Sequence, residues 1–453
     1  MKTRVGLSQT ALNAVASLGG LGQYLSGPLW GRLSDAKANK LVAVTGGSLL
    51  AAGYTTMAAV LVAVSLAGGG VNGGTVAGAI NGAVNDSSAN GNAAFALLAL
   101  GYLCVGGGSS AVFNSALSVA VKNTRPELQG RAISISVASH GLAAFIFSRI
   151  LAFFFKDRLV AFLLFMAFVC GCGPILASRF LVHVSWAQLD ELDEESNEPV
   201  ATESSILIPH HASTFVSSEV VAVEEPPSSG SAISFFAQRD VIVLFSAFVF
   251  LTGTGLMYIN NVGAVVIALS PPKSLPADIL SAQGFQVSLL SLCNCAGRLI
   301  TGFVSDALVS RWNVSRLAGL ITGGSLIAFA LAVSLLSLNS ISRLFYVTIL
   351  LGLGYGSIFS AAPTIVSSWF GSKHFGTHWG LFQIAPALGG QICNIAFGIF
   401  LDVAKSSSPG GSGSVECIGF SCFSGAFSFA LVGCALSLTA LMFLNHMRGG
   451  FFG

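Results

Sequence analysis

The sequence predicts an all-α, polytopic membrane protein, because it is very apolar and because its apolar residues occur in long, repeated runs. Hydrophobic residues make up 53% of the chain and charged residues only 9%, whereas an ordinary soluble domain is about 25% charged. A helix needs about 20 consecutive apolar residues to cross about 30 Å of hydrocarbon. The runs lack the alternation of barrel strands, which excludes a membrane β-barrel.

Eleven segments meet this length and are expected to be membrane spans. The first is not a cleaved signal peptide, since the polar Met1–Ser8 is short and Gln23 and Tyr24 interrupt the apolar run behind it. The expected spans are Ser8–Trp30, Leu41–Ala67, Ala93–Val121, Ala132–Phe155, Leu159–Val182, Val241–Leu269, Ser281–Ser305, Leu317–Leu338, Leu344–Trp369, Trp379–Leu401 and Phe423–Phe443.

The cations between the spans orient the chain. By the positive-inside rule, the loops richest in lysine and arginine are cytosolic. They follow the first, third, seventh and ninth spans and hold Arg32, Lys37, Lys40, Lys122, Arg125, Arg311, Arg316 and Lys373. The net charge is only +2, and these cations are scattered rather than clustered, so nucleic acid is not an expected partner.

A polar stretch, Leu189–Ala237, separates two apolar parts. It is acidic at its start and rich in serine, proline and glutamate, which is typical of a disordered linker. The prediction is therefore an N-terminal half of five spans in residues 1–182, a cytosolic linker in 183–239 and a C-terminal half of six spans in 240–453.

The two halves repeat each other. Gly31-Arg-Leu-Ser-Asp35 and Gly302-Phe-Val-Ser-Asp306 share the pattern Gly-x-x-Ser-Asp at the cytosolic end of a span. Six plus six spans around a long central loop resemble the major facilitator superfamily. One span precedes the motif in the second half but only seven residues precede Ser8 in the first, so we interpret the chain as a 6+6 bundle of that kind whose first helix is missing from the sequence.

Three short motifs indicate a narrower group within this superfamily. They are similar to motifs of the nodulin-like branch, and most of all to those of fungal vacuolar-membrane homologues of monocarboxylate transporters. The motifs are Tyr24-Leu-Ser-Gly-Pro-Leu-Trp-Gly-Arg-Leu-Ser-Asp35, Gly255-Leu-Met-Tyr-Ile-Asn-Asn-Val-Gly263 and Gly352-Leu-Gly-Tyr-Gly356. The resemblance implies a secondary carrier in the vacuolar membrane. It leaves the substrate open.

Arg298 is the main candidate for binding a substrate. Asp306 marks the cytosolic end of the same span, and eight residues of helix, about 12 Å, place Arg298 near the bilayer midplane, where a charged side chain costs roughly 2.5–3.5 kcal/mol. Asn294-Cys-Ala-Gly-Arg298 resembles the Asp-x-x-x-Arg of proton-coupled monocarboxylate transporters. Asn294 replaces the aspartate and cannot titrate. The alternative is a structural arginine that snorkels or bonds helix carbonyls.

Four further polar residues within spans are candidate cavity residues. His140 titrates near neutral pH and either takes part in proton coupling or is a hydrogen-bonded structural histidine. Asn260, Asn261 and Gln383 interrupt apolar helices. Such amides either line a cavity or join helices by hydrogen bonds.

The Gly-x-x-Ser-Asp segments are expected to form a conformational gate. Resemblance to the superfamily's loop motif implies that Asp35 and Asp306 pair with cations and with the N-terminus of a neighbouring helix. This chain has Ala36 where a cation is common and Ala38 where glycine is common, so we expect Lys37 and Lys40 to compensate. Arg32 and Lys37 are assigned to the gate together with the two aspartates.

Short surface signals complete the predictions. Glu203-Ser-Ser-Ile-Leu207-Ile208 has the form of an acidic dileucine sorting signal, and Asn85 is an N-glycosylation acceptor. Cys417 and Cys422 share a non-cytosolic loop and either form a disulfide in an oxidising lumen or remain thiols.

Transport of a small organic solute, such as a monocarboxylate-like anion, is the expected function, with the lipid bilayer and a possible coupling ion as further partners. No metal or other cofactor is expected. A non-transporting sensor built on the same bundle is the alternative. An enzyme is not expected, because the histidines and carboxylates are scattered rather than clustered.

Overall fold

The computed structural model describes residues 18–67, 89–155, 158–182, 235–271, 275–406 and 417–450. Ten helical segments in these ranges are long and apolar enough to cross a membrane, which confirms the predicted class. Ten of the eleven expected spans fall on them. The expected span Ser8–Trp30 lies partly outside the described residues. Its described part is helical at residues 18–25 and continues into the helix α3 (Gly27–Asp35).

The helices keep their predicted order. They are α3 (Gly27–Asp35), α4 (Asn39–Ala67), α6 (Ala89–Lys122), α7 (Gln129–Phe154), α8 (Leu159–Ala177), α11 (Arg239–Leu269), α12 (Pro276–Trp312), α13 (Leu317–Ser337), α14 (Ile341–Phe370), α15 (Phe375–Phe382), α16 (Ile384–Ser406) and α17 (Ser421–Met447), with short 3₁₀ turns at Pro126–Leu128 and Ser178–Phe180.

Helix ends differ from the predicted bounds by several residues in most spans, and two spans differ most. The expected span Ser281–Ser305 continues at both ends in α12, because Pro276 starts the helix in a position that needs no N–H donor and Asn313, with φ of 52°, ends it. The expected span Trp379–Leu401 is divided into α15 and α16 at Gln383. Pro386 explains the division, since its ring cannot donate to the carbonyl four residues earlier.

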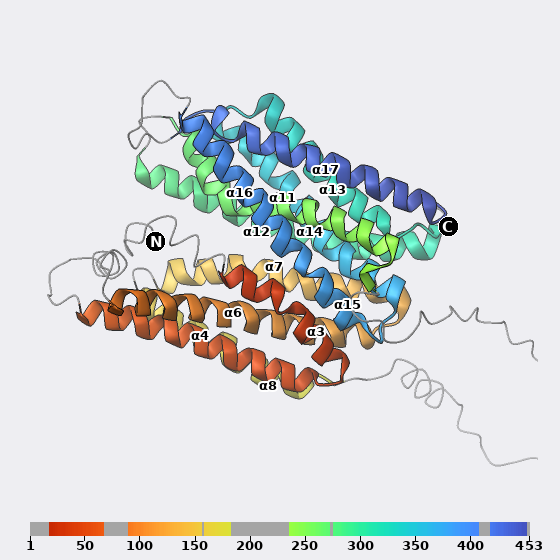
Figure 1. The fold of residues 1–453 in the computed structure, drawn as a ribbon, viewed down its shortest axis with the longest axis horizontal. Helices are drawn as coiled ribbons and strands as arrows, with labels where there is room; N and C mark the ends of the chain where they lie inside the picture. Colours follow the sequence, from red (N-terminus) through yellow and green to blue (C-terminus); the bar gives the residue numbers. More distant parts are fainter. Residues whose placement is uncertain are drawn as a thin grey trace, which may run out of the picture.

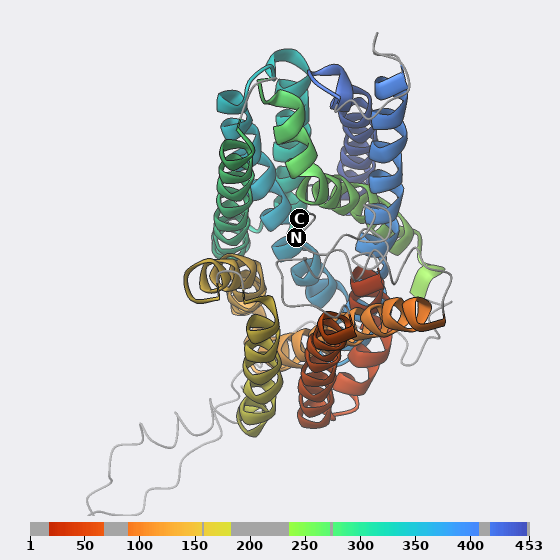
Figure 2. The ribbon, with the colours of Figure 1, turned by 90° about the vertical axis from the view of Figure 1, so that its left-hand side faces the viewer.

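The helices form two bundles, seen in Figures 1 and 2 as the red-to-yellow and green-to-blue parts. The N-terminal bundle holds α3, α4, α6, α7 and α8, and the C-terminal bundle holds α11 to α17. The bundles meet where α7 packs on α12 and where α3 packs on α15. The two helices that carry the Gly-x-x-Ser-Asp repeat, α3 and α12, therefore each contact a helix of the opposite bundle. This is the symmetry that the sequence repeat predicts.

Glycines allow close helix contacts within the N-terminal bundle. A Cβ added to Gly46, Gly53 or Gly108 would collide with a backbone oxygen of the other helix, and one added to Gly101 would collide with the Met57 side chain. In a membrane, where lipid tails are as apolar as leucine, such close backbone approach is a main source of helix association. The glycine content therefore explains how α4 and α6 pack.

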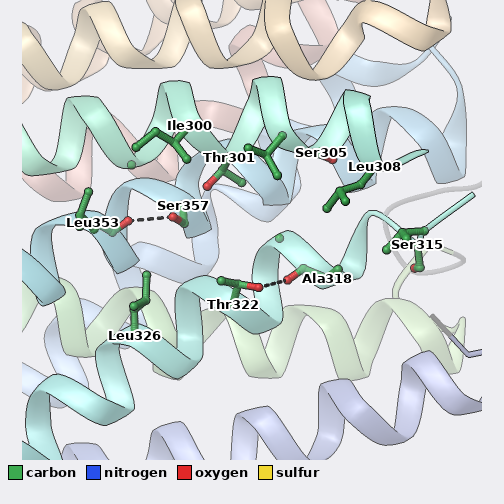
Figure 3. A pocket seen from close by; sticks show the side chains of 14 residues that line it. Ile300, Thr301, Ser305, Leu308, Ser315, Ala318, Thr322, Leu326, Leu353 and Ser357 are labelled. Carbon is green, nitrogen blue, oxygen red and sulfur yellow. Dashed lines mark hydrogen bonds between the residues drawn. The ribbon is translucent and has the colours of Figure 1, made fainter. Parts of the chain in front are cut away.

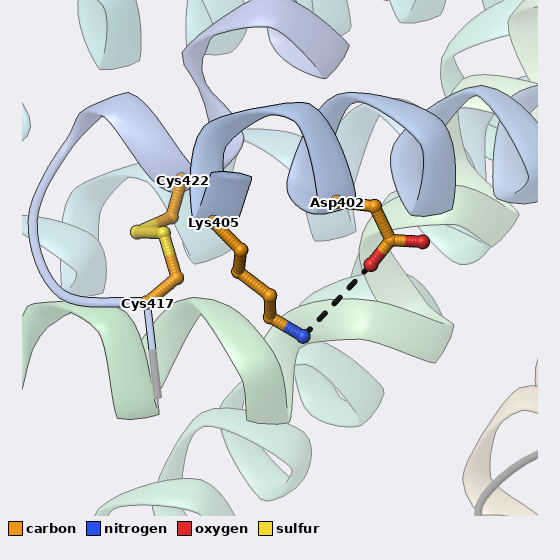
Figure 4. Close-up of a disulfide and its surroundings, with 4 residues drawn as sticks. All are labelled: Asp402, Lys405, Cys417 and Cys422. Carbon is orange, nitrogen blue, oxygen red and sulfur yellow. Dashed lines mark ion pairs between the residues drawn. A yellow bond between two sulfur atoms is a disulfide. The ribbon is translucent and has the colours of Figure 1, made fainter. Parts of the chain in front are cut away.

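A disulfide joins Cys417 to Cys422, whose Cα atoms are 5.8 Å apart (Figure 4). The Gly419 N–H donates a 2.7 Å hydrogen bond to the Ala268 carbonyl at the end of α11. The bridge thus fixes a short loop against a neighbouring helix at the entrance to α17. Of the two alternatives that the sequence left open, a disulfide or two free thiols, the structure has the disulfide. The position of this bridge indicates a structural role.

Candidate functional site

A cavity of about 1030 Å³, including its opening, lies between the two bundles. It lies beside the two contacts just described, so both bundles supply its walls. Its lining residues are Gln23, Tyr24, Ser110, Phe113, Val137, His140, Gly141 and Ala144 from the N-terminal side, and Ile259, Val287, Leu290, Ser291, Asn294, Arg298, Tyr355, Phe359, Trp379 and Gln383 from the C-terminal side.

The charge of this cavity comes from one side chain. Among the described residues that line it, Arg298 is the only lysine or arginine, and none is an aspartate or a glutamate. Arg298 is 4% exposed, and none of the ion pairs in the described part of the chain includes it. The site is therefore a buried positive charge whose counter-ion the described residues do not supply.

The guanidinium of Arg298 is held in place by neutral groups. Its Nε donates a 3.0 Å hydrogen bond to the Asn294 side chain one turn earlier on α12, and its Nη1 donates to the Val137 carbonyl of α7. The ring of Phe359 lies 5.5 Å below it, a cation–π distance. These contacts fix the orientation of the guanidinium, and its Nη2 has no hydrogen-bond partner among the described residues.

Aromatic polar groups surround the arginine. Tyr24 and Tyr355 interact through their side chains, and both lie within electrostatic reach of Arg298. Trp379 also lines the cavity, and its buried indole N–H has no hydrogen-bond partner in the described part of the structure. Sequence reasoning missed all three as site residues. Tyr24 and Tyr355 lie within two of the motifs that carry the family resemblance, and this position could have identified them as candidate site residues.

Four predicted substrate residues come together here, since Arg298, Asn294, His140 and Gln383 all line the cavity. His140 is exposed to it, with its ring 5.4 Å from that of Phe113.

Gln383 also joins the two bundles. Its amide donates to Asn114 Oδ1 at 2.8 Å, and its carbonyl oxygen accepts from Asn114 and Ser110 of α6 at 3.3 and 3.4 Å. All three residues are buried. Gln383 lies between α15 and α16, so this amide network connects the N-terminal bundle to the one break in the tenth span. Neither Asn114 nor Ser110 was predicted, because their pairing with Gln383 crosses about 270 residues of sequence.

The structure does not bring Asn260 and Asn261 into the cavity. Asn260 is exposed and is not among the described residues that line the cavity. Asn261 donates to the Asn394 side chain at 2.9 Å and to the Met257 carbonyl at 2.8 Å. It therefore joins α11 to α16 in the way that interhelical amides do.

Asp306 bonds the start of α7. Its carboxylate accepts hydrogen bonds from the backbone N–H groups of Gly130 at 3.1 Å and Arg131 at 2.7 Å, and forms a 2.9 Å ion pair with Arg316. The carboxylate is only 1% exposed. A negative charge on the free N–H groups of a helix N-terminus is favourable. We call this group the Asp306 clamp.

Asp35 makes the same contacts on the other side. It accepts from the N–H groups of Gly376 at 3.0 Å and Thr377 at 2.6 Å at the start of α15, and pairs with Lys122 at 2.8 Å. We call this group the Asp35 clamp. The cation that pairs with Asp35 in the described structure is Lys122, at the end of α6, and not one of the cations expected from the sequence.

The cations expected to compensate at Asp35, Lys37 and Lys40, are exposed, as is the other predicted gate cation, Arg32. None of the three forms an ion pair with Asp35 in the described part of the chain.

Glycine permits both clamps to close. A Cβ on Gly31 would collide with the Gly376 carbonyl, and a Cβ on Gly302 would collide with Ser134 of α7. Gly31 and Gly302 are the first residues of the two Gly-x-x-Ser-Asp words. The motif therefore combines a helix contact that only glycine allows with a carboxylate one turn later.

Two predicted signals lie outside the described residues. These are the sorting signal with Glu203, Leu207 and Ile208, and the glycosylation acceptor Asn85.

Comparisons with solved structures agree with this architecture. The proton:xylose symporter XylE superposes with a TM-score of 0.58 at 12% identity, covering 100% of this chain and 91% of that one. The human organic anion transporter MFSD10 gives a TM-score of 0.55 at 13% identity, covering 94% and 83%. At such identities the likeness shows the fold alone.

Sequence relatives agree with the structural comparison. A protein of Gibberella zeae named probable transporter MCH1 is 24% identical over 502 residues, covering 99% of this chain and 86% of that one. Another of that name, from Wickerhamomyces anomalus, is 25% identical over 413 residues, covering 88% and 73%.

The family model of the Major Facilitator Superfamily matches residues 1–390. Together with the two bundles and the shared cavity, this match shows that the chain is a multi-pass membrane protein that belongs to the Major Facilitator Superfamily.

Proposed function

We propose that this protein is a secondary carrier that moves a small organic anion, such as a monocarboxylate, across the vacuolar membrane by alternating access. The observation that supports the substrate class is Arg298, a buried cation in the central cavity with no acidic partner among the described residues. An anion that enters the cavity supplies the missing charge. Because Asn294, Val137 and Phe359 already fix the guanidinium, little ordering is left for the substrate to impose.

The same contacts separate substrate binding from proton coupling. In a carrier with an aspartate one turn before the arginine, proton binding frees the arginine for the anion. Asn294 holds the Arg298 Nε as a neutral acceptor at 3.0 Å and carries no titrating proton. We therefore propose anion uptake that does not depend on titration of this pair. His140 is the one histidine among the described residues that line the cavity.

The two clamps fit the role of a gate. They join α3 to α15 and α12 to α7 at the end predicted to be cytosolic, so the cavity cannot open to the cytosol while both are formed. Reorientation requires each carboxylate to leave its helix N-terminus. Asp35 and Asp306 therefore act on conformation rather than on the solute. The solute itself is carried unchanged.

Uptake by vacuolar vesicles tests this proposal. Labelled monocarboxylates, other organic anions and amino acids are offered with and without a pH gradient to vesicles that contain the carrier or its Arg298→Ala variant. Arg149→Ala is the matched control, because Arg149 also lies in a span but is exposed, donates to Ser288 and does not line the cavity.

We expect uptake of an organic anion that Arg298→Ala lowers by about 10- to 100-fold and Arg149→Ala preserves, at equal expression. Undiminished uptake by Arg298→Ala would contradict the role of the arginine. Absence of uptake for every solute would favour the sensor instead. Uptake that requires a pH gradient would assign coupling to a group other than Asn294.

A further inference from the structure

A second cavity, of about 700 Å³, lies away from the site, between α12 and α13 (Figure 3). Both helices pack closely on α14 but touch each other little. A groove therefore opens between them, with Leu353 and Ser357 of α14 as its floor. Small residues such as Gly319 and Ala318 face it from α13, which is why the gap is not filled from within.

The groove presents an apolar surface at the membrane-facing side of the protein. None of the described residues that line it is charged. The hydroxyls of Ser357 and Thr322 each donate at 2.8 Å to a carbonyl of their own helix, Leu353 and Ala318 respectively. At its outer rim, Ile300 and Val304 are 56% and 47% exposed, which within a membrane span means exposed to lipid. An unfilled gap here would lose dispersion contacts along its whole length.

The length of the groove matches one leaflet. From Gly297 to Leu308, α12 rises about 16 Å, close to half of the ~30 Å hydrocarbon thickness. Leu308 lies near the end predicted to be cytosolic. An acyl chain of the cytosolic leaflet therefore has both the direction and the length to lie in it.

A cation lies at the cytosolic mouth. Arg311 continues the helical stripe of Ile300 and Val304, is exposed, and forms no ion pair in the described part of the structure. Trp312 beside it is 61% exposed, as is typical of a side chain at the headgroup level. The cytosolic leaflet carries anionic phospholipids, whose phosphate complements this arginine.

We infer that the groove between α12 and α13 binds an anionic phospholipid of the cytosolic leaflet, with an acyl chain along Thr301 and Ala318 and the headgroup on Arg311. The site is separate from the solute cavity. Because α12 carries Asp306 and α13 begins beside Arg316, the bound lipid holds these two helices at the spacing that the Asp306 clamp requires.

Lipid retention measured by native mass spectrometry tests this site. The purified carrier is given phosphatidylserine or phosphatidylcholine with identical chains. One favourable contact with a basic residue corresponds to about a five-fold preference for the anionic lipid. We expect Arg311→Gln to remove that preference, and Lys373→Gln, which removes another exposed cytosolic cation, to keep it.

Substitutions that fill the groove test the position of the lipid acyl chain. Ala318→Phe and the milder Thr322→Leu should lower retention of both lipids, whereas Leu336→Phe, on the lipid-facing side of the same helix, should not. If Ala318→Phe fails to fold, Thr322→Leu decides. Unchanged retention in the folded groove variants would overturn the inference, as would displacement of the lipid by glycerophosphoserine, which has no acyl chains.

Discussion

At the scale of single residues, Arg298 and Asn294 determine what the cavity attracts. Nothing acidic among the described lining residues neutralises the arginine, so the substrate has to. Hydrogen bonds to a charged group contribute about 1.5–3 kcal/mol. We therefore expect Arg298→Ala to lower uptake at sub-saturating anion by about 10- to 100-fold. Arg298→Lys, which keeps the charge but loses the planar fork, should restore part of it. Initial rates over a range of anion concentrations measure both.

Asn294→Asp makes the opposite change at the same position. Its carboxylate would take the place of the amide oxygen 3.0 Å from the Arg298 Nε and neutralise the guanidinium at neutral pH. Below the pKa of the new carboxylate the proton would free the arginine. Anion uptake by this variant should therefore be weak at neutral pH and rise as the pH falls, while uptake by the unchanged carrier rises less. Identical pH profiles for the two proteins would contradict this account.

At the scale of helices, each clamp joins a helix end of one bundle to a helix start of the other. Loss of one buried charge-assisted contact costs about 1–3 kcal/mol. Asp306→Asn and Asp35→Asn should each shift the carrier toward the cytosol-open form by a factor of about five or more. Labelling of a cysteine placed at Ser291 by an impermeant reagent from the cytosolic side measures the shift. Asp402→Asn, which removes an exposed ion pair with Lys405 (Figure 4), should label at the original rate.

The helix contacts beneath the clamps give an independent test. Gly302→Ala places a methyl group against Ser134, whereas Gly284→Ala, on the same helix, meets open space. The first should raise cytosolic labelling and the second should not. Equal labelling of the two variants would mean that the close approach at Gly302 does not limit opening.

At the scale of the whole molecule, sequence reasoning succeeded where the physics is local. Span positions follow from apolar runs, and Arg298 stood out because a charge within a span is costly wherever it lies. Partners from distant spans could not be predicted. Lys122 on Asp35 and Asn114 on Gln383 depend on which helices become neighbours, and no local pattern encodes that.

The asparagine pair shows the same limit. Asn260 and Asn261 looked like a cavity wall because an apolar helix gives no sign of which side faces the centre. Asn261 instead contacts α16.

Sorting is a property of the complete chain and is tested separately. The proposed vacuolar location rests on the family resemblance, and the proposed sorting signal is the dileucine pattern at Glu203, Leu207 and Ile208. Replacing Leu207 and Ile208 together by alanine should move a fluorescently tagged carrier from the vacuolar membrane to the cell surface, without a change in the uptake rate per molecule. If the variant stayed at the vacuolar membrane, the dileucine pattern would not be the sorting signal.

The two clamps have a consequence for how faults in this carrier combine. They close separate contacts between the same two bundles, so they operate in parallel, and the remaining one still resists opening when either is lost. Each single substitution should therefore open the protein only in part. Because the two clamps share no partner, the Asp35→Asn, Asp306→Asn pair should open the protein by about the product of the two single effects. A seal built from two such halves fails in two steps, one for each half of the repeat.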